Sequence, residues 1–206
     1  MRPTGVHLRK VLMFLLTVAL VWLVASLVHE LSHGLTAQAL GGRFNWLSVW
    51  PGIQLWPHLG QPYQGEWGTA IAKISYTTGP GWTSQGWQEG LVWLMGSGIN
   101  LLLAGLALGA LWLFRPQGWL RYPLMAEVLM LEDVLLYATL PELLGVRHYI
   151  VFGGRRPEPV DGAAMLGCPR YVFVLLTIVI SAMMLGGLVA YVLRGRVRKH
   201  PMIAPA

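Results

Sequence analysis

Residues 11–40 read VLMFLLTVALVWLVASLVHELSHGLTAQAL, and this stretch decides the fold class. It is longer than the roughly 20 residues of helix that cross a hydrocarbon layer, so it predicts a transmembrane helix. Its only ionisable side chains are those of His29, Glu30 and His33. The stretch is too long for the apolar region of a signal peptide and has no small-residue cleavage site, so we expect it to remain in the protein.

The composition of the whole chain agrees with a membrane protein. Of its 206 residues, 55% are hydrophobic and 12% are charged. This balance excludes an intrinsically disordered chain, which combines low hydrophobicity with high net charge. Because Cys168 is the only cysteine, no disulfide can form within the chain, and a disulfide-stabilised secreted module is excluded as well.

Three further stretches are apolar and long enough to cross a membrane. We therefore predict an all-α membrane protein that forms a single domain, residues 1–206, with about four transmembrane helices. These expected helices cover residues 11–40, 91–114, 122–144 and 171–193.

The formal net charge of +6 arises largely at the two ends of the chain. Basic residues flank the first and the last apolar stretch, as is typical of segments that stay on the cytoplasmic side of a membrane: Arg2, Arg9, Lys10, Arg194, Arg196, Arg198 and Lys199. We expect both termini in the cytoplasm and the connection 115–121 on the same side. No RNA-binding motif or zinc finger accompanies the positive charge, so no nucleic-acid partner is expected.

A segment rich in Trp, Gly and Pro, residues 41–90, separates the first two apolar stretches. Apolar and polar residues alternate over 44–51 and 53–57, which predicts short strands or a β-hairpin. The tryptophans favour a position at the membrane interface. The segment either lines an entrance to a site between the helices or acts only as an interfacial anchor.

The first apolar stretch contains an H-E-x-x-H motif, from His29 to His33. Residues four apart lie on one face of a helix, so the two imidazoles can bind one zinc ion, with Glu30 beside them to take a proton from metal-bound water. Ionisable side chains inside a membrane span are costly unless they are paired, and they mark functional sites. Two alternatives are that these side chains only hydrogen-bond neighbouring helices, or that they hold zinc without hydrolysis.

Two histidines do not complete a catalytic zinc site, which usually has three protein ligands and leaves the fourth position to water. The extended metzincin pattern would supply a third histidine six residues after the second. It fails here, because Thr36 stands at the glycine position and Ala39 at the histidine position. The third ligand must come from another part of the chain.

The chain resembles the site-2 protease family of intramembrane zinc metalloproteases. The resemblance rests on residues 29–34, HELSHG, within a predicted transmembrane helix and followed by LGGR at 40–43. It also rests on residues 96–100, GSGIN, which are similar to the family motif Gly-Pro-x-x-Asn with Ser97 in place of proline. It implies one bound Zn²⁺ and hydrolysis of peptide bonds in membrane-embedded proteins or peptides. It further implies that Asn100 holds the substrate backbone or stabilises the oxyanion.

In this family the third zinc ligand is an aspartate on a later span, often followed by glycine, and the chain offers two candidates. Asp161, in Pro159-Val160-Asp161-Gly162, matches the motif more closely but lies in a polar loop. Asp133 lacks the glycine but lies inside the apolar stretch 122–144. His148 and Glu132 are further alternatives.

The depth of each residue in the membrane favours Asp133. At 1.5 Å per residue, His29 and His33 lie about 18 and 12 Å below the external surface. The same estimate puts Asp133 at about 17 Å and Asn100 at about 14 Å. These groups therefore share one layer of the membrane, whereas Asp161 would have to fold inward from its loop.

The expected activity is that of a zinc metalloendopeptidase in which Glu30 activates zinc-bound water. A transmembrane substrate must unwind before cleavage, and strand edges in the Trp-rich segment can receive it by strand addition. The alternatives are a non-catalytic zinc-binding regulator or chaperone of the membrane, and a metal transporter. The presence of Glu30 favours the endopeptidase over these alternatives, because zinc binding alone does not require it.

Overall fold

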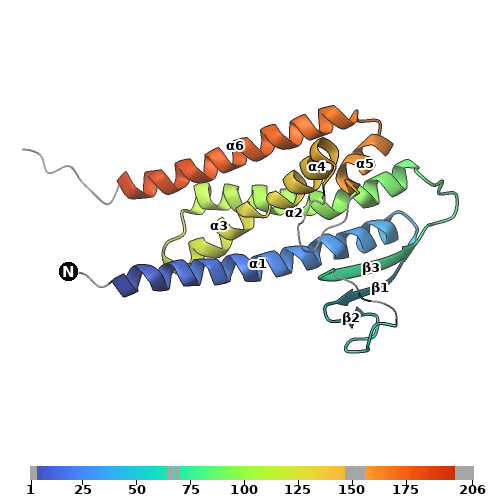
Figure 1. Ribbon diagram of the computed structural model, residues 1–206, viewed down its shortest axis with the longest axis horizontal. Coiled ribbons are helices and arrows are strands. Elements are labelled where there is room, and N and C mark those ends of the chain that lie inside the picture. The colour runs from blue at the N-terminus through green and yellow to red at the C-terminus, as the bar shows by residue number, and fades with distance from the viewer. Residues whose placement is uncertain (1–3, 65–66, 68–69, 147–155, 198–206) are drawn as a thin grey trace, which may run out of the picture.

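The computed structural model describes residues 4–64, 67, 70–146 and 156–197. Helices make up most of it, and a small sheet lies beside the second half of the first helix (Figure 1). The α-helices are α1 Thr4–Ala39, α2 Trp87–Phe114, α3 Arg121–Leu129, α4 Glu132–Leu144, α5 Glu158–Met165 and α6 Arg170–Val197. A 3-10 turn, Gly118–Leu120, precedes α3, and the strands are β1 Arg43–Val49, β2 Ile53–Trp56 and β3 Ala72–Thr77.

Three helices within the described residues are long and apolar enough to cross a membrane: Leu8–Ala39 of α1, all of α2, and Arg170–Arg194 of α6. Large apolar side chains stand exposed along them, including Leu16, Leu113 and Met183. In a membrane such side chains contact lipid. The chain therefore has the helices of a membrane protein, as its composition predicted.

The third predicted span, 122–144, is not one helix. A turn at Met130 and Leu131 divides it into α3 and α4. There the Met130 amide donates to the Glu127 carbonyl at 3.0 Å, and the Asp133 amide donates to the Met130 carbonyl at 3.1 Å. These hydrogen bonds reach three residues back along the chain instead of the four of an α-helix. Leu131, which is 1% exposed, packs at this turn into the core formed by α2, α3 and α6. Hydropathy predicted the length of the apolar stretch but not the break.

The region predicted as a polar loop before the last span contains α5, which packs closely on α2. A Cβ on Gly162 would lie 2.5 Å from the carbonyl oxygen of Gly90, so the two backbones touch at a pair of glycines. Any larger side chain at Gly162 would separate the helices. This contact fixes α5 against the first turns of α2.

The Trp-rich segment forms the two predicted strands, β1 and β2, and a third strand, β3, which lies outside the stretches 44–51 and 53–57 that predicted strands. They make an antiparallel sheet in the order β2-β1-β3, which leaves β3 at one edge. The sheet packs against α1, where Gly34 faces the ring of Phe44: a Cβ on Gly34 would lie 2.5 Å from Phe44 Cδ2. The edge strand thus runs beside the part of α1 that carries the H-E-x-x-H motif (Figure 1).

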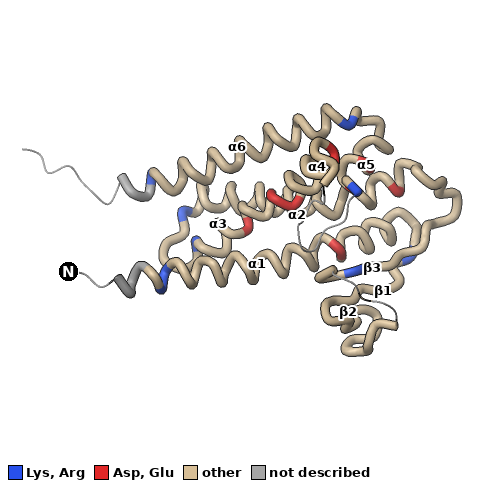
Figure 2. The backbone as a smooth tube through the Cα atoms, viewed as in Figure 1, with Lys and Arg blue, Asp and Glu red and all other residues tan. Residues whose placement is uncertain are grey.

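Charges are distributed unevenly along the molecule. Figure 2 shows Lys and Arg, without Asp or Glu, at the end where α1 and α3 begin and α2 and α6 finish, where Lys10, Arg115, Arg121 and Arg194 stand; further Lys and Arg residues lie towards the opposite end, among the acidic ones. Most acidic residues lie in the middle and towards the opposite end (Figure 2). The beginning of α1 and the end of α6 therefore share the basic end of the molecule.

Candidate metal centre

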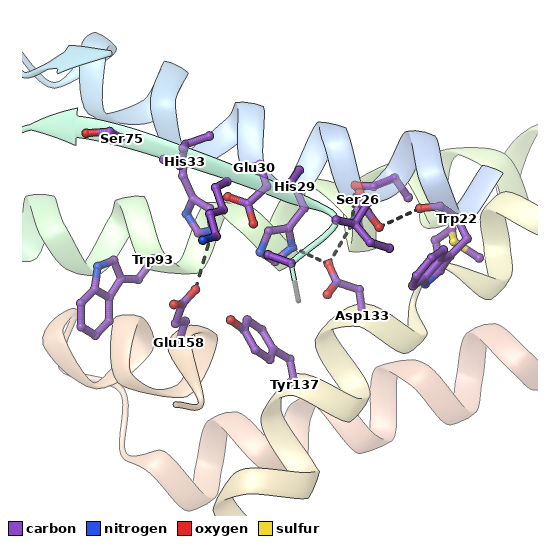
Figure 3. A pocket seen from close by; sticks show the side chains of 18 of the residues that line it. Trp22, Ser26, His29, Glu30, His33, Ser75, Trp93, Asp133, Tyr137 and Glu158 are labelled. Carbon is purple, nitrogen blue, oxygen red and sulfur yellow. Dashed lines mark hydrogen bonds and ion pairs between the residues drawn. The ribbon is translucent and has the colours of Figure 1, made fainter. Parts of the chain in front are cut away.

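Two histidines of α1 and a glutamate of α5 form a cluster that can hold a metal ion. Their ligand atoms, one each from His29, His33 and Glu158, all lie within 4.8 Å of one another. His33 Nε2 is 3.9 Å from Glu158 Oε2, and the two imidazole rings meet edge to face with centroids 4.9 Å apart. Figure 3 shows the three side chains directed towards one another.

The remaining nitrogen of each imidazole is held by an acceptor. His29 Nδ1 donates to Asp133 Oδ2 at 2.7 Å, and His33 Nδ1 donates to the carbonyl oxygen of Val92 at 2.6 Å. Because both acceptors require a proton on Nδ1, the neutral rings carry their lone pairs on Nε2. The lone pairs are therefore available for a metal ion, as in the carboxylate–histidine–metal arrangement common in metalloproteins.

Gly96 of α2 lies directly beneath the two imidazoles. A Cβ at this position would lie 2.3 Å from His33 Nε2 and 2.6 Å from His29 Nε2. Both nitrogens therefore converge on one point of α2, and only glycine lets α2 pass so close. This convergence, together with the N and O donor set, fits a divalent cation.

Asp133 and Asn100 form a hydrogen-bonded chain behind His29. The side-chain Nδ2 of Asn100 donates to Asp133 Oδ2 at 2.8 Å and to the carbonyl oxygen of Ala25 at 3.2 Å. Asn100 is 2% exposed and Asp133 7% exposed. The structure thus brings His29, Asp133 and Asn100 together, with the carboxylate at Nδ1 of the ring and not at Nε2.

The other predicted ligands lie elsewhere. Asp161 forms an ion pair with Arg170, with Oδ1 2.5 Å from Nη1. Glu132 lines the same cavity as the cluster, at the end near Trp22. His148 lies outside the described residues.

Glu158 was not among the residues predicted from the sequence. It stands in a short polar stretch, Arg155-Arg156-Pro157-Glu158, that has no transmembrane character. The available signal was Pro159: proline is favoured in the first turn of a helix, so Glu158 and Asp161 can share one helical turn. The docking of that turn onto α2 depends on tertiary contacts.

A cavity of about 730 Å³ opens beside the cluster, within the range of small-ligand and peptide pockets. The helices contribute Glu30 and the cluster itself, and Glu30 lies between the two histidines (Figure 3). The strand β3 lines the cavity as well, through residues Ala72 to Tyr76. The edge strand and the metal-binding side chains therefore face one space.

A contact between β3 and α2 closes one side of this cavity. Trp93 Nε1 donates to the hydroxyl oxygen of Tyr76 at 3.3 Å. Burial of the hydroxyl raises the pKa of Tyr76 above its usual value, so the group stays protonated at neutral pH. The hydroxyl is therefore a neutral hydrogen-bonding group on the strand side of the cavity.

The arrangement as a whole consists of two imidazoles with free Nε2 lone pairs, a carboxylate within reach of them, a second carboxylate in the same cavity and an edge strand that lines it. The imidazoles and Glu30 stand on the apolar helix α1, Glu158 on the short helix α5. Comparison of the chain with family models, curated proteins and solved structures found no match.

Proposed function

We propose that the protein is a zinc-dependent intramembrane endopeptidase. The observation that carries the proposal is the convergence of His29 Nε2 and His33 Nε2 on Gly96, with Glu158 within 4.8 Å of both histidines and Glu30 in the same cavity. Water activation needs these groups, and a structural polar junction does not. The similarity of the sequence to the site-2 protease family supports the same activity.

In this proposal His29, His33 and Glu158 would hold the zinc ion, which matches the three protein ligands usual in catalytic zinc sites. The bound ion supplies a Lewis acid that lowers the pKa of a water molecule and polarises the scissile carbonyl. Glu30 takes the proton from the water and passes it to the leaving amine.

Asp133 and Asn100 act through His29. The Asp133 carboxylate holds the proton on Nδ1 and fixes the ring, and Asn100 fixes the carboxylate through its 2.8 Å hydrogen bond. The resemblance implies a role for Asn100 at the substrate. Its Nδ2 already donates to Asp133 and to Ala25, so we assign it to positioning.

The substrate is an unwound segment of a membrane protein or peptide. Backbone groups of a transmembrane helix are occupied by hydrogen bonds within the helix, so the scissile bond is accessible only after local unwinding. The edge strand β3 lines the same cavity as the metal-binding side chains and can pair with the unwound segment. Backbone pairing of this kind would hold the peptide extended beside Glu30.

We further propose that α3 and α4 together make a fourth membrane crossing and that both termini lie in the cytoplasm. The basic residues at the shared end of α1, α2, α3 and α6 support this orientation, because cytoplasmic flanks are enriched in Lys and Arg. The site then lies below the opposite membrane surface.

The test is cleavage of a transmembrane substrate with a helix-destabilising centre by purified protein, with zinc content measured by mass spectrometry. Glu30→Gln should retain one zinc per chain and lose cleavage by at least about 100-fold, the contribution of a general base. Glu89→Gln is the matched control, because Glu89 caps the start of α2 at the Gln85 amide, away from the cavity.

Two outcomes would contradict the proposal. Cleavage that survives unchanged in Glu30→Gln would remove the assigned chemistry. A wild-type protein that binds zinc but cleaves no membrane substrate would indicate a zinc-binding regulator instead.

A further inference from the structure

Arg170, the first residue of α6, joins three helices at the end of the molecule opposite the basic one. Its Nε donates to Glu142 Oε1 of α4 at 2.8 Å and its Nη2 to Glu142 Oε2 at 2.5 Å. Its Nη1 donates to Asp161 Oδ1 of α5 at 2.5 Å. We name this group, Arg170 with Glu142 and Asp161, the Arg170 clamp. The guanidinium binds one carboxylate with two nitrogens and the second carboxylate with its third nitrogen. It therefore fixes the orientation of both carboxylates.

The clamp holds the same helical turn that carries Glu158. Asp161 follows Glu158 by three residues in α5, so the two carboxylates move together. Glu158 extends towards His33 while Asp161 extends towards Arg170. The position of Glu158 at the metal cluster is thus tied to the position of α6.

A helix as short as α5 needs such attachments. Eight residues are too few for a stable isolated helix, so tertiary contacts must determine where α5 lies. The Gly90–Gly162 contact fixes its distance from α2, and the clamp fixes its second side against α4 and α6. The Arg170 side chain is 41% exposed, and an ion pair so exposed adds little to global stability. Its effect is therefore on geometry.

We infer that the Arg170 clamp positions Glu158 for metal binding, and that Asp161 acts on the metal through Arg170 and Glu158 without being a ligand itself. The inference rests on the proposed metal site. It explains why Asp161 lies in a sequence that resembles a zinc-ligand motif although its carboxylate binds the guanidinium of Arg170.

The two roles of Asp161 predict different responses to the loss of Arg170. If Asp161 is a positioning residue, removal of Arg170 and removal of the Asp161 charge break the same link. If Asp161 is a ligand, removal of Arg170 releases its carboxylate and leaves metal affinity unchanged or higher.

The experiment is titration of purified full-length protein in detergent with Zn²⁺ against a competing chelator, and with Co²⁺ followed by visible absorption. Arg170→Gln and Asp161→Asn should each weaken metal binding by about 10-fold or more, the effect typical of partners behind the ligands. The double variant should be no weaker than either single variant, because both act on one link. Arg170→Lys keeps the charge and should recover part of the affinity.

The Co²⁺ spectrum tests the donor set directly. At saturating Co²⁺ the Asp161→Asn spectrum should match that of the wild type, because the ligands are the same. Arg194→Gln, on the same helix but at its opposite end, is the matched control and should leave both the affinity and the spectrum unchanged.

An altered Co²⁺ spectrum in Asp161→Asn, or unchanged affinity in Arg170→Gln, would overturn the inference, as would additive losses in the double variant. A wild-type protein that binds neither metal would instead overturn the proposed function, so the two failures are distinguishable. Size-exclusion elution and circular dichroism identify any variant that does not fold. Arg170→Lys and Asp161→Asn then carry the comparison.

Discussion

Glu158 brings its carboxylate to within 3.9 Å of His33 Nε2 from a helix remote in sequence. Replacement by glutamine keeps the size of the side chain and removes the charge that binds a cation. Glu158→Gln should therefore weaken zinc binding by more than the roughly 10- to 100-fold loss seen for partners behind the ligands. Chelator competition measures the change, with Glu89→Gln as the isosteric control. Equal affinity in the two variants would exclude Glu158 as a ligand.

Replacement of Asp133 should weaken zinc binding less than replacement of Glu158. The Asp133 carboxylate accepts from His29 Nδ1 and Asn100 Nδ2, and an asparagine can replace the acceptor but not its charge. Asp133→Asn should weaken zinc binding by about 10-fold, and Asn100→Ala by a similar factor, since both loosen His29. The same chelator competition applies. Loss of zinc in Asp133→Asn as complete as in Glu158→Gln would make Asp133 the ligand.

The sequence was informative about residues that share a helix or a depth in the membrane. The spacing of His29 and His33 predicted their common face, and counting residues along the spans predicted that Asp133 and Asn100 lie at the same level. The structure brings all of them together. Glu158 could not be found in this way, because its position depends on the docking of α5 and not on depth along an apolar stretch.

At the scale of the element, the histidine side chains of α1 pack directly against Gly96 of α2. A Cβ there would overlap His33 Nε2 at 2.3 Å, whereas a Cβ on Gly98 would meet only the Met95 sulfur at 3.9 Å. Gly96→Ala should abolish zinc binding and lower the unfolding free energy by about 1–3 kcal/mol, the cost of overpacking. Gly98→Ala should do neither. Zinc titration and thermal unfolding in detergent measure both effects, and equal behaviour of the two variants would contradict the packing.

Hydropathy and alternation predicted α1, α2, α6 and the strands β1 and β2, because each depends on a pattern within its own residues, whereas β3 was not predicted. They did not predict the division of 122–144 into α3 and α4, since a turn with bonds three residues back leaves the apolar composition unchanged. Nor did they predict α5, whose place depends on Gly90 and Gly162 meeting across two helices.

At the scale of the whole molecule, the basic end and the metal cluster should face opposite sides of the membrane. Cys168 lies between α5 and α6, and Gln117 lies in the connection between α2 and α3. A membrane-impermeant maleimide added outside sealed cells should label Cys168. It should not label Gln117→Cys in a Cys168→Ser background until the membrane is permeabilised. The reverse pattern would invert the orientation, and labelling of both from outside would exclude an intervening span.

The turn at Met130 and Leu131 also affects the electrostatic environment of Asp133. Because α4 begins anew at Glu132, Asp133 lies in the first turn of a helix, where the aligned peptide dipoles produce partial positive charge. An unbroken helix would put the same carboxylate in mid-helix without that compensation. The interruption in the backbone thus makes it less costly for an anion to persist at this depth, beside the imidazole that it orients.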